Sequence, residues 1–139
     1  MFFNKKAKIE EKNFPLSKIG SLLIHAAKID EDYSEIEENI VKKTLISLGA
    51  SSKNIDELIA LSIKEEENSN QILEFTKEAK NLSEENKIKI IEALWKIIYS
   101  NQNADIYETN LMRRLAGLLY IDSKIMGDIK ERIKSEVIK

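Results

Sequence analysis

The chain has 139 residues, enough for one domain, and its 42% hydrophobic and 33% charged residues favour a folded core over disorder. Four glycines and one proline cannot supply the turns that an all-β domain needs, so an all-α fold is expected. The net charge of -2 excludes the positive excess typical of nucleic-acid binders, and the absence of cysteine excludes disulfides and thiolate metal sites.

Two features indicate where the protein resides. The longest stretches without Asp, Glu, Lys or Arg, residues 19–27 and 44–52, are about half of the ~20 residues that cross a bilayer, so no membrane span is expected. The N-terminus begins MFFNKK and continues into Lys- and Glu-rich sequence without the apolar segment of a secretory signal. A cytoplasmic location is therefore predicted.

The first predicted helix covers residues 15–29. Residues 1–13 are interpreted as a lead-in, and residues 14–139 as one helical domain. From Leu16 onward, apolar residues recur at intervals of three and four, and further apolar residues widen this stripe. Such a pattern is typical of a largely buried helix.

The second predicted helix begins at Ser34, because Ser34 and Glu37 have the spacing of a capping box. Gly49 is expected to end this helix as a left-handed C-terminal cap. The apolar positions predicted for the helix are Ile36, Ile40, Val41, Thr44, Leu45 and Leu48.

A third helix is predicted over about 52–65, and the acidic run Glu65–Glu67 is interpreted as a solvated helix end. A short fourth helix carries Phe75. Ser83, Asp105 and Asp122 are interpreted as the N-terminal caps of three more helices. Seven helices in one bundle are therefore expected.

The two halves of the chain are related by a shift of 71 positions. Under this shift Ser34 falls on Asp105 and Glu37 falls on Glu108, and many apolar positions of the flanking helices also coincide. Matched spacing across a loop and two helices indicates an internal repeat. The predicted fold is thus an all-α, single-domain seven-helix bundle built from two three-helix pseudo-repeats.

Each unit has acidic or amide residues between its first two helices. Asp30 follows a helix C-terminus, where a carboxylate is unfavourable by about 0.3–1 kcal/mol unless it meets amides, an arginine or a bound cation. An EF-hand is excluded, because its loop requires a glycine and a bidentate glutamate where this chain has Glu35 and Val41.

These segments resemble the TerB-like family, named for tellurite resistance protein B, in which A-x-A-D-G ends one helix and x-x-D-x-x-E opens the next, twice in the chain. The second unit is the closer match, from Ile91 through Leu94-Trp95 and Arg113-Arg114 to Leu119. The resemblance covers about residues 16–133. It implies an all-helical domain of tellurite-resistance and stress proteins, related to a region of DjlA-type co-chaperones.

The resemblance also implies positions that bind a divalent cation, calcium or magnesium. These are Asp30 and Glu37 in the first unit, where Asp32 adds a further oxygen ligand, and Asp105 and Glu108 in the second. Helix capping explains the same spacing completely and is compatible with ion binding. We favour capping, and we expect no cofactor and at most weak cation binding.

Three other features receive structural interpretations. His25, the one histidine, lies on an apolar helix and is interpreted as packed or hydrogen-bonded between helices rather than catalytic. Trp95 is interpreted as a core residue. Arg113 and Arg114 are two of three arginines in a lysine-rich chain, and one of them is expected to hold a loop carboxylate through two bonds.

Together these observations favour a non-enzymatic interaction or scaffold module of the stress response, with a protein partner and no nucleic acid. A dedicated calcium- or other divalent-cation-binding stress protein is the alternative. A metal-dependent hydrolase ranks third, because such enzymes assemble several His and Asp ligands and this chain has one histidine.

Overall fold

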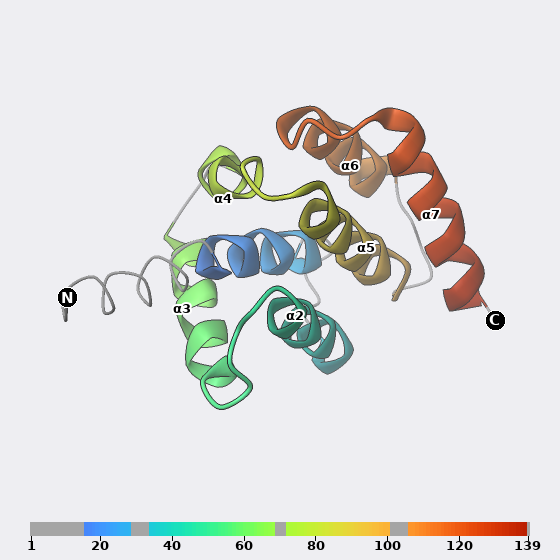
Figure 1. Ribbon diagram of the computed structural model, residues 1–139. Coiled ribbons are helices and arrows are strands. Elements are labelled where there is room, and N and C mark those ends of the chain that lie inside the picture. Colours follow the sequence, from blue (N-terminus) through green and yellow to red (C-terminus); the bar gives the residue numbers. More distant parts are fainter. Residues whose placement is uncertain (1–15, 29–33, 69–71, 101–105, 139) are drawn as a thin grey trace.

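The computed structural model describes residues 16–28, 34–68, 72–100 and 106–138; the predicted lead-in, residues 1–13, lies outside them. Within this part of the chain every regular element is a helix, and the all-α prediction is confirmed. The helix of residues 16–28 is followed by α2 (Glu35–Ser47), α3 (Ile55–Glu67), α4 (Ile72–Ala79), α5 (Glu84–Ser100), α6 (Ile106–Leu118) and α7 (Ser123–Ile138) (Figure 1). None of these described helices is long and apolar enough to cross a membrane.

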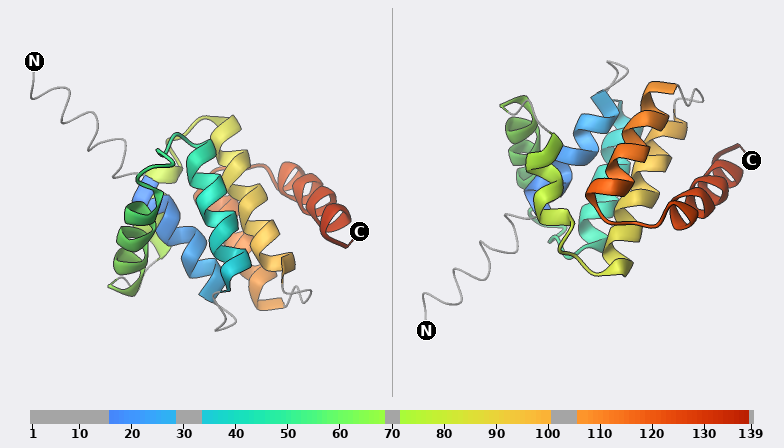
Figure 2. Two further views of the ribbon diagram at one scale, coloured as in Figure 1. Left: turned by 90° about the horizontal axis from the view of Figure 1, so that it is seen from below. Right: turned by 90° about the horizontal axis from the view of Figure 1, so that it is seen from above.

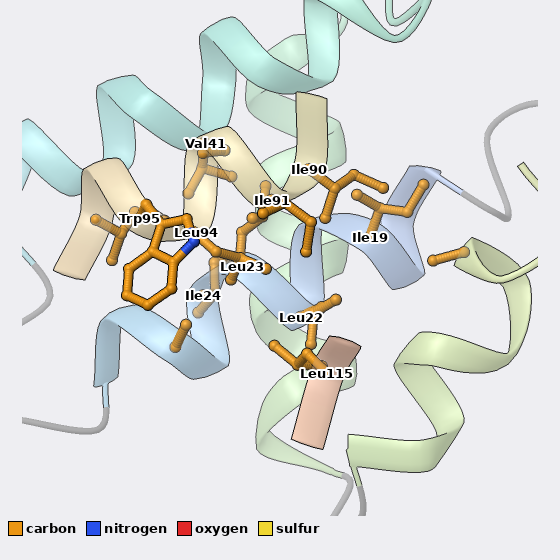
Figure 3. Close-up of a cluster of buried hydrophobic side chains, with 14 of the residues drawn as sticks. Ile19, Leu22, Leu23, Ile24, Val41, Ile90, Ile91, Leu94, Trp95 and Leu115 are labelled. Atoms are coloured by element: carbon orange, nitrogen blue, oxygen red, sulfur yellow. The ribbon is translucent and has the colours of Figure 1, made fainter. Parts of the chain in front are cut away.

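Helix 16–28 and α5 form the centre of the bundle. Leu22, Leu23 and Ile24 of helix 16–28 are fully buried, and the buried apolar residues of α5 extend from Ile90 to Tyr99. Figure 3 shows side chains of these two helices gathered with others from α2 and α6. Helices that are apolar over most of their circumference lie inside a bundle. Helix 16–28 and α5 are therefore the central helices, and the other helices pack around them.

The remaining helices are arranged around this pair. Among α2–α7, α5 packs most extensively against α7 and α2, and smaller contacts join α2 to α3, α4 to α6 and α6 to α7. α2 and α5 lie side by side and run in opposite directions (Figure 2).

An ion pair joins α2 to α3. Lys42 Nζ of α2 lies 3.1 Å from Asp56 Oδ1 of α3, and this hydrogen bond raises the pKa of Lys42.

The predicted N-terminal caps of α2, α5 and α7 are confirmed. Ser34 begins α2 with both bonds of a capping box. Ser83 Oγ accepts a hydrogen bond from the Asn86 N–H at 3.2 Å, and Asp122 Oδ1 accepts one from the Lys124 N–H at 2.9 Å. Each cap satisfies an amide that would otherwise lack a partner at the helix start.

α3 starts later than the sequence predicts. The expected start is near Ser52, but the Ser51 side chain accepts from the Lys53 N–H at 3.3 Å and its carbonyl accepts from the Asn54 N–H at 3.1 Å. These bonds close a turn, so the helix begins at Ile55, and it continues to Glu67 instead of ending near Glu65.

The sequence places Ile36 on the apolar stripe of α2, and this prediction is wrong. The Ile36 side chain is 65% exposed, whereas Glu37 is fully buried. Because the capping box turns the Glu37 side chain back toward Ser34, the first turn of α2 presents Ile36 to solvent.

α2 and α6 end in the same Schellman motif. After α2, the Ala50 N–H donates to the Leu45 carbonyl at 2.9 Å. After α6, the Ile121 N–H donates to the Ala116 carbonyl, also at 2.9 Å. This bond from the second residue beyond the helix satisfies a carbonyl that has no partner within the helix.

The residue before each of these donors adopts a positive φ, 119° at Gly49 and 57° at Tyr120. Gly49 is thus the predicted left-handed cap, and Tyr120 occupies the matching position under the shift of 71 residues. The matching caps support the internal repeat, and superposition of the two units stays a prediction.

Gly49→Ala is expected to lower the free energy of unfolding by about 1 kcal/mol, because an L-residue is strained at this φ. No atom lies within 4 Å of the position that a Cβ would occupy at Gly49, so backbone strain is the whole cost. Urea unfolding measures it. Gly117→Ala, which is equally open but has no positive φ, is the control and should be neutral or stabilising. Equal urea midpoints for both variants would contradict this account.

Candidate functional site

The helices that flank the two acidic segments in the sequence share one end of the bundle. Helix 16–28 and α5 both end there, and α2 and α6 both begin there (Figure 2). The arrangement follows from the opposite directions of neighbouring helices. It places Glu37 and Glu108, one predicted cation position from each unit, in the first turns of two helices at the same end.

Glu37 is a fully buried carboxylate in the first turn of α2. Its Oε1 accepts a hydrogen bond from the Ser34 N–H at 2.9 Å, and the Glu37 N–H donates to Ser34 Oγ at 3.2 Å. A carboxylate near a helix N-terminus also interacts favourably with the helix dipole. The predicted capping role of Glu37 is therefore confirmed.

The other predicted cation positions are not described in the structure. Asp30, Asp32 and Asp105 lie outside the described residues, and the Glu108 side chain is also outside them, although its backbone belongs to α6. Among the side chains that are described, no three His, Cys, Asp or Glu residues form a group able to hold a metal ion. Cation binding thus stays a prediction.

A row of polar contacts, which we call the polar seam, joins helix 16–28 to α3. Ser17 Oγ donates to Glu65 at 3.2 Å, and Lys18 Nζ lies 3.3 Å from the same carboxylate. One turn further along, Ser21 Oγ donates to the Ser62 carbonyl at 2.7 Å in a buried position. Buried polar groups are thereby satisfied across the interface, which favours one register of the two helices.

The polar seam continues to His25. Its Nδ1 lies 3.4 Å from Glu66 Oε1, and Lys28 Nζ lies 3.0 Å from Glu66 Oε2. The prediction of an interhelical histidine is confirmed. The interpretation of Glu65–Glu67 as a solvated helix end is wrong for Glu65 and Glu66, because their carboxylates bind cations and hydroxyls of helix 16–28; only Glu67 is largely exposed.

Trp95 is buried in α5, as predicted, with 3% of its surface exposed. Tyr99 stacks on it with ring centroids 5.8 Å apart, and Lys130 Nζ of α7 lies 5.5 Å from the indole centroid. Burial raises the pKa of Tyr99. These contacts join the C-terminal half of α5 to α7, so Trp95 is a structural residue at this interface.

A comparison with protein families identifies the chain. The family model described as Tellurite resistance protein TerB matches residues 17–131, a span that includes both units and most of the chain. The chain belongs to the TerB family. Neither the curated proteins nor the solved structures give a significant match to it.

The arginine pair of the TerB domain is exposed on α6. Neither Arg113 nor Arg114 forms an ion pair with a described residue. The loop carboxylates expected to pair with them lie outside the described residues, so that pairing stays a prediction. Arg132, the third arginine, binds Glu92 at 3.1 Å and thereby joins α7 to α5.

One surface of the TerB domain was not predicted from the sequence. A groove between α4 and the end of α6 is lined by Thr76, Lys77, Lys80, Gly117, Leu118 and Tyr120. The internal repeat contains a signal that points to it, because the alignment places Tyr120 where the first unit has Gly49. A tyrosine at a position that favours glycine has a strained backbone, and strained residues cluster at functional sites.

Proposed function

We propose that this chain is a non-enzymatic interaction module of the tellurite-resistance type, acting in the stress response in the cytoplasm. The observation that carries the proposal is its membership of the TerB family over residues 17–131. The single histidine supports it, because His25 contacts Glu66, a carboxylate that Lys28 also binds, within a helix–helix interface. That arrangement fits a structural role for the histidine better than proton transfer to a substrate.

The interaction role predicts that a protein partner contacts exposed apolar side chains. Among the side chains that the structure describes, the most exposed of the large apolar residues are Ile36, Leu61 and Tyr120, which are 65%, 42% and 71% exposed. A photo-crosslinking residue at each position should capture a defined protein in cells, whereas one at the exposed polar positions Asn39 or Lys43 should capture less. Capture at none of the three apolar positions would contradict the interaction role.

We also propose weak binding of a divalent cation by acidic residues in the first turns of α2 and α6 and just before these helices in the sequence. The first unit supplies Asp30, Asp32 and Glu37, and the second supplies Asp105 and Glu108. Calcium gains affinity from each carboxylate, so three of them support a dissociation constant of only about 10⁻⁴–10⁻³ M. The alternative, a dedicated cation-binding protein, is favoured by the location of the first turns of α2 and α6, which carry Glu37 and Glu108, at one end of the bundle.

Calorimetric titration with calcium and with magnesium distinguishes weak cation binding from a dedicated cation-binding protein. Weak calcium binding that is lost in Asp30→Asn but retained in the exposed control Asp128→Asn is the expected result. Micromolar binding would instead identify a dedicated cation-binding protein. Absence of binding at roughly 10 mM calcium, about tenfold above the weakest expected dissociation constant, would contradict the cation proposal and leave the interaction module.

A further inference from the structure

The groove between α4 and α6 lies at the end of the bundle opposite the first turns of α2 and α6. α6 ends beside it and α5 begins beside it, whereas α6 begins and α5 ends at the other end of the bundle (Figure 2). Leu118 contributes an apolar side chain, and Lys77, Lys80 and Tyr120 also line the groove. It therefore combines positive charge with apolar contact area.

Tyr120 lines this groove, and its backbone is strained there. Its φ of 57° is one that glycine adopts more easily, and Gly49 has the matching role after α2. The tyrosine is 71% exposed, so burial in this chain does not compensate for the strain. Strained residues gather at binding sites, and an exposed aromatic ring suits contact with a partner.

Lys87 adds a third positive charge beside the groove. Its Nζ lies 6.0 Å from the centroid of the Tyr120 ring, and the residue is only 7% exposed. It lies in the first turn of α5, where the helix dipole is unfavourable for a cation. Among the described residues, no carboxylate pairs with Lys77, Lys80 or Lys87. Lys87 alone of the three is buried, and buried lysines are usually paired, which favours an anionic group at this groove.

We infer that this groove binds an acidic peptide segment of a partner protein, with an apolar side chain placed against Leu118 and Tyr120. The inference rests on the proposed interaction role and names the chemistry of the partner. The three lysines come from α4, from the turn after it and from α5, and charges on separate elements suit carboxylates spaced along a chain. The tyrosine supplies the aromatic contact that commonly anchors such interfaces.

The test is fluorescence anisotropy at low salt with a labelled peptide in which glutamates flank one leucine. Lys77→Gln/Lys80→Gln is expected to weaken binding about tenfold, since each exposed charge pair contributes up to about 1 kcal/mol. Lys43→Gln/Lys53→Gln removes the same charge from exposed positions on α2 and the turn before α3, and should change affinity by less than about twofold.

Tyr120→Gly separates binding from stability. It should weaken peptide binding while leaving the urea midpoint unchanged or higher, because glycine relieves the strained backbone. Equal loss in both lysine pairs would mean non-specific attraction and would overturn the inference. So would displacement of the peptide by inorganic phosphate or by phosphatidylserine vesicles at matched charge concentration. A wild-type chain that does not bind the peptide but is still crosslinked to a protein would overturn this groove's role and leave the interaction module standing.

Discussion

Gly20→Ala is expected to destabilise the protein by about 1–3 kcal/mol through overpacking. Gly20 is buried in helix 16–28, where its backbone faces α3 and α2. A Cβ at this position would clash with Ser62 Oγ, approach Ser62 Cβ to 2.9 Å and approach Leu45 Cδ1 to 3.3 Å. The neighbouring bond from Ser21 to the Ser62 carbonyl holds the helices at this separation. Urea unfolding, followed by circular dichroism, measures the loss.

Two further variants test the cause. Gly127→Ala lies in α7 with no atom within 4 Å of the added Cβ, and it should stabilise by up to about 1 kcal/mol through helix propensity. Ser62→Gly should rescue part of the loss when combined with Gly20→Ala, because it removes both clashing atoms of Ser62. Additive effects of these two substitutions would show that close packing at Ser62 is not the cause.

Glu37→Ala is expected to cost about 1–3 kcal/mol, because the Ser34 N–H loses its acceptor at a partly buried helix start. Removal of a fully buried side chain adds a packing loss in the same direction. Glu37→Gln retains an oxygen that can accept the bond, so it should be less destabilising. Thermal and urea unfolding, each with chelator present, measure the effect without a contribution from bound cation.

Glu57→Ala provides the matched control for this prediction. Glu57 is the third residue of α3, as Glu37 is of α2, but it is exposed and the side chain of the Asn54 cap makes no capping bond. Its removal loses mainly an interaction with the helix dipole, which contributes about 0.5 kcal/mol or less at an exposed position. If Glu37→Ala and Glu57→Ala unfold at the same urea concentration, the buried capping box does not stabilise the protein.

Much of the fold was predictable because helix starts and apolar periodicity are local signals. The caps Ser34, Ser83 and Asp122 and the left-handed Gly49 act within a few residues of themselves, and the structure has each of them in its predicted role. Ile36 was misassigned because apolar periodicity alone does not encode how a capping box rotates the first turn.

The candidate site was less predictable because its contacts join residues distant in sequence. Glu66 meets His25 across 41 positions, and the sequence gives no indication that α3 lies along helix 16–28. The groove is even less predictable from the sequence, because only the packing of separate helices brings Lys87 near Tyr120. Tyr120 alone had a sequence signal, through its alignment with Gly49.

The central position of α5 has a consequence for how the protein unfolds. α5 belongs to the second unit, yet it packs against α2 of the first unit as well as α7 of its own. An excised first unit would therefore expose the face of α2 that packs against α5, and the single buried core draws residues from both halves. We therefore expect the two halves of the chain to unfold as one cooperative unit, with the amides of α5 exchanging with solvent only through global opening.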